Sequence, residues 1–567
     1  MTPAAALPSS PDLDTTVRRW AAQTALFAVR PTRLDLLRLA LPADPAAPRW
    51  RINVWRNHAF ETVASLAGPF LAHGGWHADW RLGPYDDSLG FAGWQAADAE
   101  LLWLDGRRLA ALHAAERWPW LGGRLAALRG LSEVPIVVAS WFDTDEEAAS
   151  ARALCAELPG VHLADLGAAC AEAGVPLLDA RSAQVAGTPL AGPAQTVLAR
   201  ELACRWLPAA LQPPVKAIVL DLDHTLHAGV LGEDGPHGVT LTPAHAALQR
   251  LLKGLRDEGV FLALVSRNEA ADVRALFAAR DDYPLRWDDF ATRQVGWGDK
   301  AAAVLAVSQA LRIAPDAMVF VDDNPGELGQ VVLAVPGLRT VRAEADAALT
   351  ARALQYHPGL WRWTRTADDG KRLDDLLAAS QRQALEAQAA DPAAYFRSLR
   401  IRLVPSLAGP AQIDRLADLC VRTNQFNLSL QRSGTARLHA WSQRPDAAVM
   451  GVALTDRLSD SGTIAVLVAE RHGARLVVEE LCISCRALGR RLEDAIVVSA
   501  LRAMPLFAGC AEVDFRVAVG ERNAPALDWL AGWLSRPERP SPGLHTVSAD
   551  RLRDLALDPA LAVGPAA

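Results

Sequence analysis

Polar side chains able to handle phosphate follow three short apolar runs of the sequence. Asp221 and Asp223 follow the run AIVL, Ser266 follows VFLALV, and Asp322 follows MVFV. Lys300 stands between the second and third runs, at the start of a stretch of helical character. Short apolar runs flanked by Pro and Gly predict buried parallel strands. Because the carboxyl ends of parallel strands line one ligand-binding crevice, we expect these five side chains to meet there.

The residue types in this set indicate the chemistry. Two buried carboxylates need a cation or a proton, since an unpaired buried charge is costly. A serine that ends a strand and opens a helix is a natural phosphate ligand, because the free N–H groups of the helix point at the same oxygens. A lysine adds a point charge for phosphate. The sequence therefore predicts a phosphoryl-transfer site that holds a hard cation, Mg²⁺.

The order Asp-x-Asp-x-Thr, Ser, Lys, Asp-Asp resembles the four motifs of the haloacid dehalogenase (HAD) superfamily of phosphoryl-transfer enzymes. The resemblance implies that Asp221 is the nucleophile and forms an aspartyl-phosphate, and that Asp223 is the general acid and base. It implies that Asp221, Asp322 and the backbone carbonyl of Asp223 hold Mg²⁺. The predicted phosphate-binding residues are Thr225, Ser266, Arg267, Asn268 and Lys300, and Asp323 and Asn324 are expected beside the metal.

The segment that follows Asp223 has room only for a short flap before the next helical stretch. Turns are expected at its glycines, Gly229, Gly232, Gly235 and Gly238. No long insertion follows the second apolar run either. The site therefore lacks a large cap, and an open site suits a phosphate carried on, or delivered to, something bulky.

Length and composition bound the protein class. The 567 residues are too many for one core and predict about three domains. The net charge of -7 argues against nucleic-acid binding. The 7 cysteines, an odd number spread thinly, favour a reducing cytoplasm over a disulfide framework. No apolar run of membrane-spanning length and no signal sequence occurs, so we expect a soluble cytoplasmic protein without a membrane partner.

The segment from Arg51 to the run VPIVVAS near residue 134 alternates strand and helix patterns, which predicts a parallel sheet. Its place before the HAD motifs resembles the SGNH-hydrolase-like module of the FkbH-like proteins. The Gly-Asp-Ser block of an active SGNH enzyme is missing, and RINVWRNHAFE stands in its place. We therefore expect a structural or docking domain, in which Asn57, His58 and Ser88 serve packing or loops.

Residues 365–395 predict a helical connector. The segment that follows alternates strands and helices, and its strand, Arg-x-x-Gly-x and helix order resembles the pyrophosphate loop of GNAT acyltransferases. A helix is expected to begin at Ala487. Arg491 departs from that loop, which usually has a small residue there. The resemblance implies acyl-carrier or pantetheine contacts at Asn424, Phe426, Asn427, Arg486, Gly489, Arg490 and Asn523.

Taken together, DLDHTLHAGVLGEDG, VSRN, VDDNP, RTNQFNLS and ISCRALGR resemble the FkbH-like proteins, HAD subfamily IIIC, over roughly residues 50–535. The resemblance implies transfer of a glyceryl unit from D-1,3-bisphosphoglycerate to the phosphopantetheine thiol of an acyl carrier protein, with removal of phosphate, for polyketide-type biosynthesis. Two alternatives stay open: a phosphatase or acyltransferase that serves another acyl phosphate, and a non-catalytic carrier-docking scaffold.

Several positions depart from the FkbH-like pattern. His224 and His227 replace the usual Asn and Trp, and Val265 stands where many relatives have a cysteine. A protein-bound thioester would then use Cys485, or less readily Cys482. Arg486 and the helix start would lower the pKa of the Cys485 thiol. The alternative is that Cys485 is only a small buried strand residue.

The predicted fold class is α/β with three domains. Their predicted bounds are an N-terminal extension at 1–45, an SGNH- or flavodoxin-like domain at 46–212, a HAD Rossmann-like domain with a minimal cap at 213–364, the connector at 365–395, a GNAT-like α+β domain at 396–545 and a tail at 546–567.

Overall fold

The computed structural model describes residues 13–39, 41, 47–85, 88–111, 114–185, 188–364, 391–488 and 490–564, together with residues 371, 375, 378, 381, 382, 385 and 386. The chain forms two compact units, Ala5–Arg365 and Thr366–Ala567. Two parallel sheets lie in the first unit and one mixed sheet in the second, which confirms the α/β class. Among the described residues, no helix combines the length and apolarity needed to cross a membrane.

The N-terminal part of the first unit is a five-stranded parallel sheet in the order β2-β1-β3-β4-β5. Its elements are α1 (Leu13–Leu26), α2 (Arg33–Arg38), β1 (Arg49–Arg56), α3 (Glu61–His73), β2 (His77–Leu82), η1 (Ser88–Gly90), β3 (Ala99–Trp103), η2 (Gly106–Ala111), α4 (Ala114–Leu131), β4 (Ile136–Ser140), α5 (Asp145–Glu157), β5 (Val161–Asp165), α6 (Leu166–Glu172), α7 (Ala180–Val185), α8 (Gly192–Glu201), η3 (Leu202–Trp206) and α9 (Leu207–Leu211).

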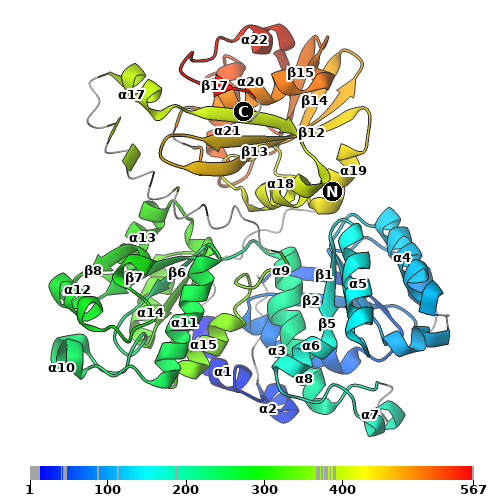
Figure 1. Ribbon diagram of the computed structural model, residues 1–567, viewed down its shortest axis with the longest axis vertical. Helices are drawn as coiled ribbons and strands as arrows, with labels where there is room; N and C mark the ends of the chain where they lie inside the picture. Colours follow the sequence, from blue (N-terminus) through cyan, green and yellow to red (C-terminus); the bar gives the residue numbers. More distant parts are fainter. Residues whose placement is uncertain are drawn as a thin grey trace. The chain divides into compact units, whose positions relative to one another are not determined.

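Helices cover both faces of this sheet, with α4 and α5 on one side and α3 and α8 on the other (Figure 1). Strands β3 and β4 are buried along their whole length, as expected when both faces are covered. Alternate residues of β3 therefore enter different cores. Leu102 packs in the cluster under α4 and α5, while Leu101 packs in the cluster under α3.

The second sheet is also parallel, in the order β10-β9-β6-β7-β8. Its elements are β6 (Ala217–Leu220), α10 (Leu231–Gly238), α11 (Pro243–Asp257), β7 (Phe261–Ser266), α12 (Ala270–Ala279), η4 (Trp287–Asp289), β8 (Phe290–Val295), α13 (Lys300–Leu311), η5 (Pro315–Ala317), β9 (Met318–Asp322), α14 (Pro325–Ala334), β10 (Arg339–Arg342) and α15 (Ala347–Gln355). Strand β6 lies in the centre of the sheet, between β9 and β7, as an apolar run without alternation predicts.

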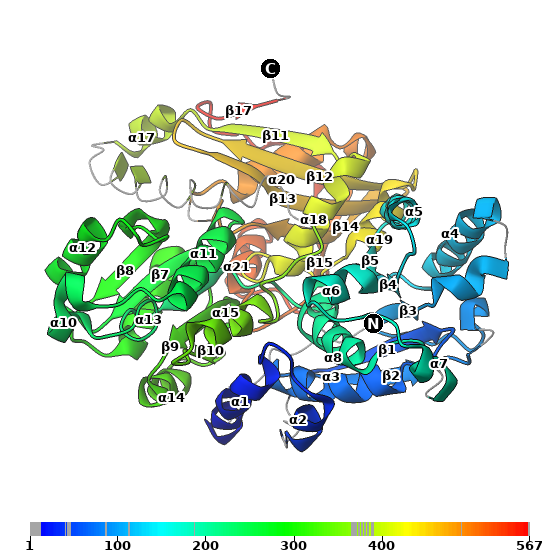
Figure 2. The same cartoon turned by 60° about the horizontal axis from the view of Figure 1, so that its bottom comes forward.

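The segment predicted as an N-terminal extension takes part in this unit. Helix α1 contacts both α14 and α3 (Figure 2). Trp20 donates its indole N–H to Thr340 Oγ1 at 3.0 Å, and Gln23 donates to the carbonyl of Arg342 at 2.6 Å. Leu26 is fully buried in a hydrophobic cluster that runs from the α3 face of the first sheet into the second. The two parallel sheets therefore share one core.

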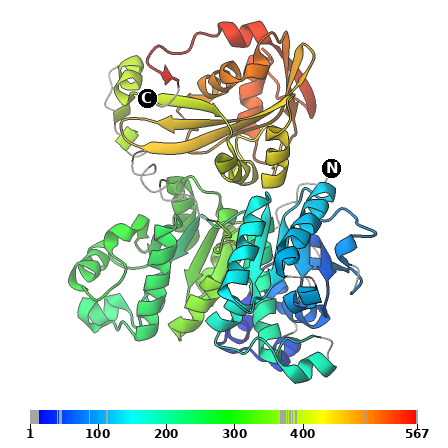
Figure 3. The same cartoon turned by 45° about the vertical axis from the view of Figure 1, so that its right-hand side comes forward.

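The second unit is built on a seven-stranded mixed sheet in the order β16-β15-β14-β13-β12-β11-β17. Its elements are α17 (Pro392–Leu399), β11 (Arg402–Leu407), α18 (Pro410–Arg422), α19 (Thr435–Ser442), β12 (Ala447–Thr455), β13 (Asp460–His472), β14 (Arg475–Ile483), α20 (Glu493–Ala503), η6 (Pro505–Phe507), β15 (Glu512–Val517), α21 (Ala524–Trp533), β16 (Gly543–Ser548), α22 (Ala549–Asp554) and β17 (Ala562–Val563). The yellow helices α18 and α19 and the orange helix α20 lie on opposite faces of the sheet (Figure 3).

Strands β14 and β15 are parallel neighbours only at their beginnings, from Arg475 to Val478 on β14. Beyond that point residues 426–428 lie between them. Leu428 donates its N–H to the carbonyl of Leu481, and its own carbonyl accepts from Ala518 N. Ile483 in turn donates to the carbonyl of Phe426. The chain thus fills the gap between the two strands with its own backbone.

Two expectations about the end of the chain need adjustment. The helix expected from Ala487 begins at Glu493. A turn precedes it, and Arg491 has a left-handed backbone with φ 55°, a conformation that no α-helix contains. The segment predicted as a tail carries α22 and β17, and Ala549 and Leu552 of α22 are buried in the core of the unit.

The packing of α1 gives a stability prediction. We expect Leu26→Ala to lower the free energy of unfolding by about 2–5 kcal/mol, because the truncation leaves a cavity in the shared core. Val17→Ala is the matched control on the same helix: its side chain is 47 % exposed, and we expect a change within about 0.5 kcal/mol. Urea denaturation measures both. Equal stability of the two variants would mean that α1 does not belong to the folded core.

Candidate functional site

The carboxyl ends of β6 and β9 bring two aspartates and one lysine together. Lys300 Nζ lies 2.9 Å from Asp221 Oδ1 and 2.6 Å from Asp322 Oδ2. Asp221 directly follows β6, Asp322 ends β9, and Lys300 is the first residue of α13. All three are buried, and Asp322 is fully so. The lysine therefore balances two carboxylates that would otherwise repel each other out of water.

The electrostatics of this trio follow from burial and charge. Burial, together with the neighbouring charge of Asp322, raises the pKa of Asp221 to about 8, although Lys300 opposes the shift. Burial also raises the pKa of Asp322, again against Lys300. For Lys300, burial alone would lower the pKa, but the two carboxylates outweigh it and the pKa is raised. Lys300 is therefore charged, and Asp221 keeps its proton at neutral pH in the metal-free protein, because one lysine does not neutralise two ionised carboxylates.

Asp223 is held by three hydrogen-bond donors. Its Oδ1 accepts from Leu231 N at 2.9 Å and lies 3.1 Å from His227 Nε2, while its Oδ2 accepts from Asn268 Nδ2 at 2.7 Å. Burial alone would raise the pKa of Asp223, but these contacts outweigh it and the pKa is lowered. His227 is fully buried and its Nδ1 lies 3.0 Å from the hydroxyl of Tyr283. Asp223 is thus ionised and fixed in one orientation.

The predicted phosphate ligands line the same edge. Ser266 ends β7 and its hydroxyl accepts from Asn268 Nδ2 at 3.0 Å, so Asn268 links Ser266 to Asp223. Thr225 is buried, and within the part of the chain that the structure describes its Oγ1 has no hydrogen-bond partner. A buried free hydroxyl is costly unless a ligand satisfies it. Arg267 is partly exposed and pairs with Glu327 at 2.6 Å.

The residues beside the trio fit a hard cation. Carboxylate oxygens of Asp221, Asp322 and Asp323 all lie within 4.8 Å of one another. Oxygen ligands from two or more carboxylates are what Mg²⁺ takes in proteins. Asn324 does not join them: its side chain caps α14 by accepting from Gly326 N at 2.9 Å, and its backbone N–H donates to Asp322 Oδ1 at 2.8 Å. Asn324 therefore orients the helix and Asp322.

The flap after Asp223 is short, as predicted. The flap contains α10. Two of its glycines have a left-handed backbone: Gly229, which precedes the helix, at φ 103°, and Gly235, within it, at φ 69°. A side chain at Gly229 would also meet Asp234 Oδ2 at 2.6 Å, because that carboxylate accepts the N–H of Val230 at 2.9 Å. Gly232 and Gly238 lie within the bounds of α10 instead of forming separate turns.

Two functional contacts were not foreseen. The sequence pattern marks His227 only as a departure from the FkbH-like proteins, and it does not mark Tyr283. The two lie 56 positions apart in the sequence, and the fold brings them together where α12 packs against the flap helix α10. A histidine four residues after Asp223 is a usable local signal, whereas nothing in the sequence around Tyr283 marks it.

The predicted acyl-carrier residues are occupied by internal contacts. Phe426 and Asn427 are buried in the segment that fills the gap between β14 and β15. Asn427 Nδ2 donates to the carbonyls of Cys420 and Thr423, and Asn523 Nδ2 donates to the carbonyl of Asn427 at 3.0 Å. Asn424 Oδ1 accepts from Arg432 at 2.8 Å. These contacts support the backbone of the second unit itself.

The loop after β14 also has internal partners. Arg490 lies 3.0 Å from Asp375 and 3.2 Å from Asp456, two buried carboxylates. Arg486 Nη2 donates to the carbonyl of Thr463 at 3.2 Å. Helix α20 carries acidic side chains in its first turn, which disfavour an anion there. Cys485 is half-buried and unpaired with another cysteine, and Gly489 lies outside the described residues.

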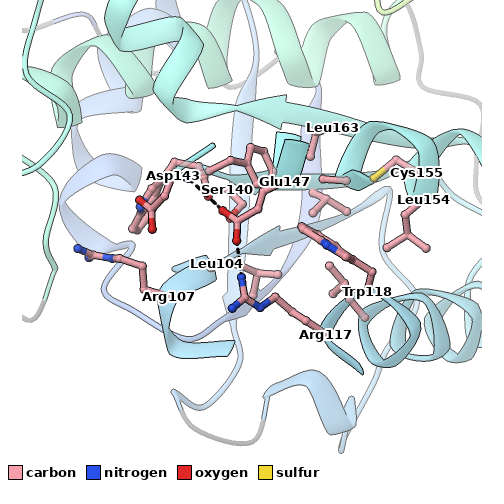
Figure 4. A pocket seen from close by; sticks show the side chains of 16 residues that line it. Leu104, Arg107, Arg117, Trp118, Ser140, Asp143, Glu147, Leu154, Cys155 and Leu163 are labelled. Atoms are coloured by element: carbon pink, nitrogen blue, oxygen red, sulfur yellow. Dashed lines mark hydrogen bonds and ion pairs between the residues drawn. The ribbon is translucent and has the colours of Figure 1, made fainter. Parts of the chain in front are cut away.

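The N-terminal sheet has a cavity of about 100 Å³ at the carboxyl ends of β3 and β4 (Figure 4). Apolar side chains such as Trp118 and Leu163 form much of its wall. Its charged groups pair with protein partners: Arg117 with Glu147 at 2.7 Å, and Arg107 with Asp105 at 3.1 Å. Asp143 also lines the cavity, and its backbone N–H donates to Glu147 Oε2 at 3.2 Å.

The polar residues of the N-terminal domain that the sequence singles out are Asn57, His58 and Ser88. His58 is fully buried, 3.3 Å from Thr188 Oγ1, and burial lowers its pKa to about 3, so it is neutral. Asn57 exchanges two hydrogen bonds with the backbone of Asp105. Ser88 begins η1. The contacts of Asn57 and His58 fit a packing role.

Comparison with known proteins adds a fold likeness. No family model matches the chain, and no curated protein matches it. Among solved structures, the crystal structure of the N-terminal part of the protein BF1531 from Bacteroides fragilis, containing a phosphatase domain complexed with Mg, is similar at 19% identity and a TM-score of 0.44. The similarity covers 60% of this chain and 99% of that one.

The raised pKa of Asp221 gives a pH prediction for the metal-free protein. An unfolded aspartate has a pKa near about 4, and the folded one titrates at about 8. The stabilisation linked to the retained proton is therefore complete below the unfolded pKa and is lost as the pH rises through the folded one. We expect the wild type in chelator to lose stability across this window, and Asp221→Asn, which cannot ionise, to lose less.

Urea denaturation across the window measures this difference. Asp257→Asn is the control, because Asp257 is an exposed carboxylate whose side chain is 60% accessible, and it should follow the wild type. Identical pH slopes for the wild type and Asp221→Asn would show that Asp221 titrates as an ordinary exposed aspartate.

Proposed function

We propose that the protein is a Mg²⁺-dependent phosphatase or phosphotransferase whose nucleophile is Asp221. The observation that carries the proposal is the arrangement at one sheet edge: a lysine bridges Asp221 and Asp322, and Asp223, two residues on, is oriented by three donors. A nucleophile, a separate acid and base, and a cation for phosphate oxygens are the parts that phosphoryl transfer through a carboxylate needs.

The chemistry follows from the positions of these groups. A carboxylate oxygen of Asp221 attacks phosphorus, a bond to the leaving oxygen breaks, and an aspartyl-phosphate forms. Asp223 gives the leaving oxygen its proton and later takes one from the water that attacks the same phosphorus. That attack breaks the bond between phosphorus and the Asp221 oxygen, so that inorganic phosphate leaves and the Asp221 carboxylate is restored. Asp223 is ionised in the free protein, the form suited to the second step. A phosphate bound beside it raises its pKa, because like charges disfavour ionisation, and this favours the protonated form for the first.

The remaining residues bind and orient. Lys300, Ser266 and the free hydroxyl of Thr225 are placed to hold the phosphate oxygens, and Asn268 keeps Ser266 and Asp223 in a fixed relation. Asp221, Asp322 and Asp323 would hold Mg²⁺, which neutralises phosphate charge when bound. His227 and Tyr283 act through Asp223 by fixing its carboxylate.

The first test is hydrolysis of a small phosphate monoester. We expect turnover with Mg²⁺ and none in excess chelator, and we expect Asp221→Asn to lower kcat by about 10³ or more, since it replaces the nucleophile. Asp257→Asn is the control and should keep full activity. Release of inorganic phosphate measures both. Turnover by Asp221→Asn at the wild-type rate would remove Asp221 from the reaction.

The finer proposal concerns the substrate. The resemblance of the motifs to FkbH-like proteins supports a three-carbon phosphate, with the glyceryl unit loaded from D-1,3-bisphosphoglycerate onto an acyl carrier protein. The short flap supports it too, because a site without a large cap admits a phosphate on a carrier. Cys485, half-buried after β14, is the proposed acyl-bearing thiol. Another acyl phosphate is the alternative that the same architecture allows.

Mass spectrometry of the carrier protein tests this substrate. With bisphosphoglycerate and Mg²⁺, the wild type should give glyceryl-carrier and Asp221→Asn should stop at phosphoglyceryl-carrier or at the unmodified carrier. Cys485→Ala should abolish loading and leave hydrolysis of the small monoester unchanged. Full glyceryl-carrier from Cys485→Ala would make the cysteine a packing residue, and an unmodified carrier with the wild type would favour another acyl phosphate.

A further inference from the structure

Two thiols and a carboxylate gather inside the second unit, and none of them belongs to the proposed phosphatase site. They are Cys420 at 0%, Glu480 at 0% and Cys482 at 1% exposure. One ligand atom of each lies within 4.8 Å of the others. This cluster, called the Cys420–Glu480–Cys482 cluster below, is independent of the proposed phosphatase site.

The fold brings the three side chains to one face of the sheet. Glu480 and Cys482 are two positions apart on β14, so they project from the same face. Helix α18 covers that face and contributes Cys420. The segment that fills the gap beside β14 encloses the cluster, because Asn427 pairs with Cys482 and donates to the carbonyl of Cys420.

The charges in the cluster are unbalanced. The neighbouring Glu479 faces the other way and pairs with Arg516 at 2.5 Å. Glu480 has no ion pair within the described part of the chain; it accepts the N–H of Ser433 at 3.2 Å and lies 3.8 Å from Cys482 Sγ. A buried carboxylate needs a proton or a cation. A bound metal ion explains this group of residues better than a proton does, because the two neighbouring cysteines can bind a metal ion as thiolates.

We propose that the Cys420–Glu480–Cys482 cluster is a structural site for a thiolate-preferring divalent ion, Zn²⁺. Two sulfur ligands and one carboxylate suit Zn²⁺ and exclude Mg²⁺, which prefers oxygen alone. The hydroxyl of Ser433, whose N–H already contacts Glu480, is a candidate fourth ligand. On binding, both thiols lose their protons to solvent and form sulfur–metal bonds.

Such an ion would fasten α18 to β14 in the middle of the second unit. The site is fully buried, so the ion enters while the unit folds and does not exchange through an open channel. Its two positive charges offset two of the three negative charges that Glu480 and the two thiolates carry. The rival state has no metal: the three groups keep their protons, since burial raises the pKa of Glu480 and of both thiols.

The test is the zinc content of the tag-free full chain, produced in medium supplemented with Zn²⁺ and dialysed against chelator. Every chain measured also carries Asp221→Asn, so that zinc bound at the proposed phosphatase site does not add to the measured zinc content. We expect about one zinc per chain in this background, and a loss of at least about fivefold when Cys420→Ser or Cys482→Ser is added. Cys510→Ser is the control: Cys510 is buried in the same unit and donates to the carbonyl of Leu506.

Two further measurements keep the result decisive if a cysteine variant folds poorly. Glu480→Gln keeps the side-chain shape and should lower zinc occupancy while circular dichroism stays unchanged. Replacement of zinc by Co²⁺ should produce a thiolate-to-cobalt absorption band that Cys510→Ser retains. A chain that retains no zinc in the Asp221→Asn background, equal zinc in all variants, or a disulfide between Cys420 and Cys482 in peptide mass analysis would each overturn the proposal.

Discussion

The buried contact of one lysine with two aspartates governs the first unit. Asp221 and Asp322 lie at the ends of adjacent strands in the middle of a parallel sheet, where neither can be hydrated. Lys300 alone cannot balance both, so the site has a net demand for positive charge. A site of this kind binds a divalent cation and an anionic substrate together, because each compensates the other's charge. The same imbalance that costs stability in the free protein would favour binding of the phosphate and the metal ion that we propose for this site.

The orientation of Asp223 at this site depends on residues from several neighbouring segments. Asp223 is placed by the backbone of the flap, by Asn268 after β7 and by His227, which is itself fixed by Tyr283. These groups come from the flap, from the residues after β7 and from the residues after α12. The shared hydrophobic core extends further, to α1 and the N-terminal sheet. The shared core thus joins the N-terminal sheet to the sheet that carries the candidate site.

The second unit uses its polar residues for internal order. Residues 426–428 close the gap between β14 and β15, Asn427 and Asn523 hold that segment, and Arg490 joins Asp375 to Asp456. Residue types that bind phosphate or pantetheine in an open cleft here satisfy buried backbone and carboxylate groups. Buried polar side chains nearly always have hydrogen-bond partners. Where the chain itself fills the gap, the neighbouring polar side chains hydrogen-bond to the chain. Residues 426–428 thus fill the gap between β14 and β15 with the chain's own backbone.

The sequence by itself determined the strands of the first unit and the side chains at their ends. Apolar runs set β6, β7 and β9, and a residue that directly follows a buried parallel strand has little freedom in where it points, so Asp221, Ser266 and Asp322 could be placed together from order alone. Contacts between distant segments could not be read in this way. The pairing of Tyr283 with His227, the shared core around Leu26, the closure by residues 426–428 and the carboxylate partners of Arg490 depend on how elements pack. Packing depends on the shape and burial of many residues together, which no local sequence pattern contains. Only the tertiary structure therefore decided these contacts.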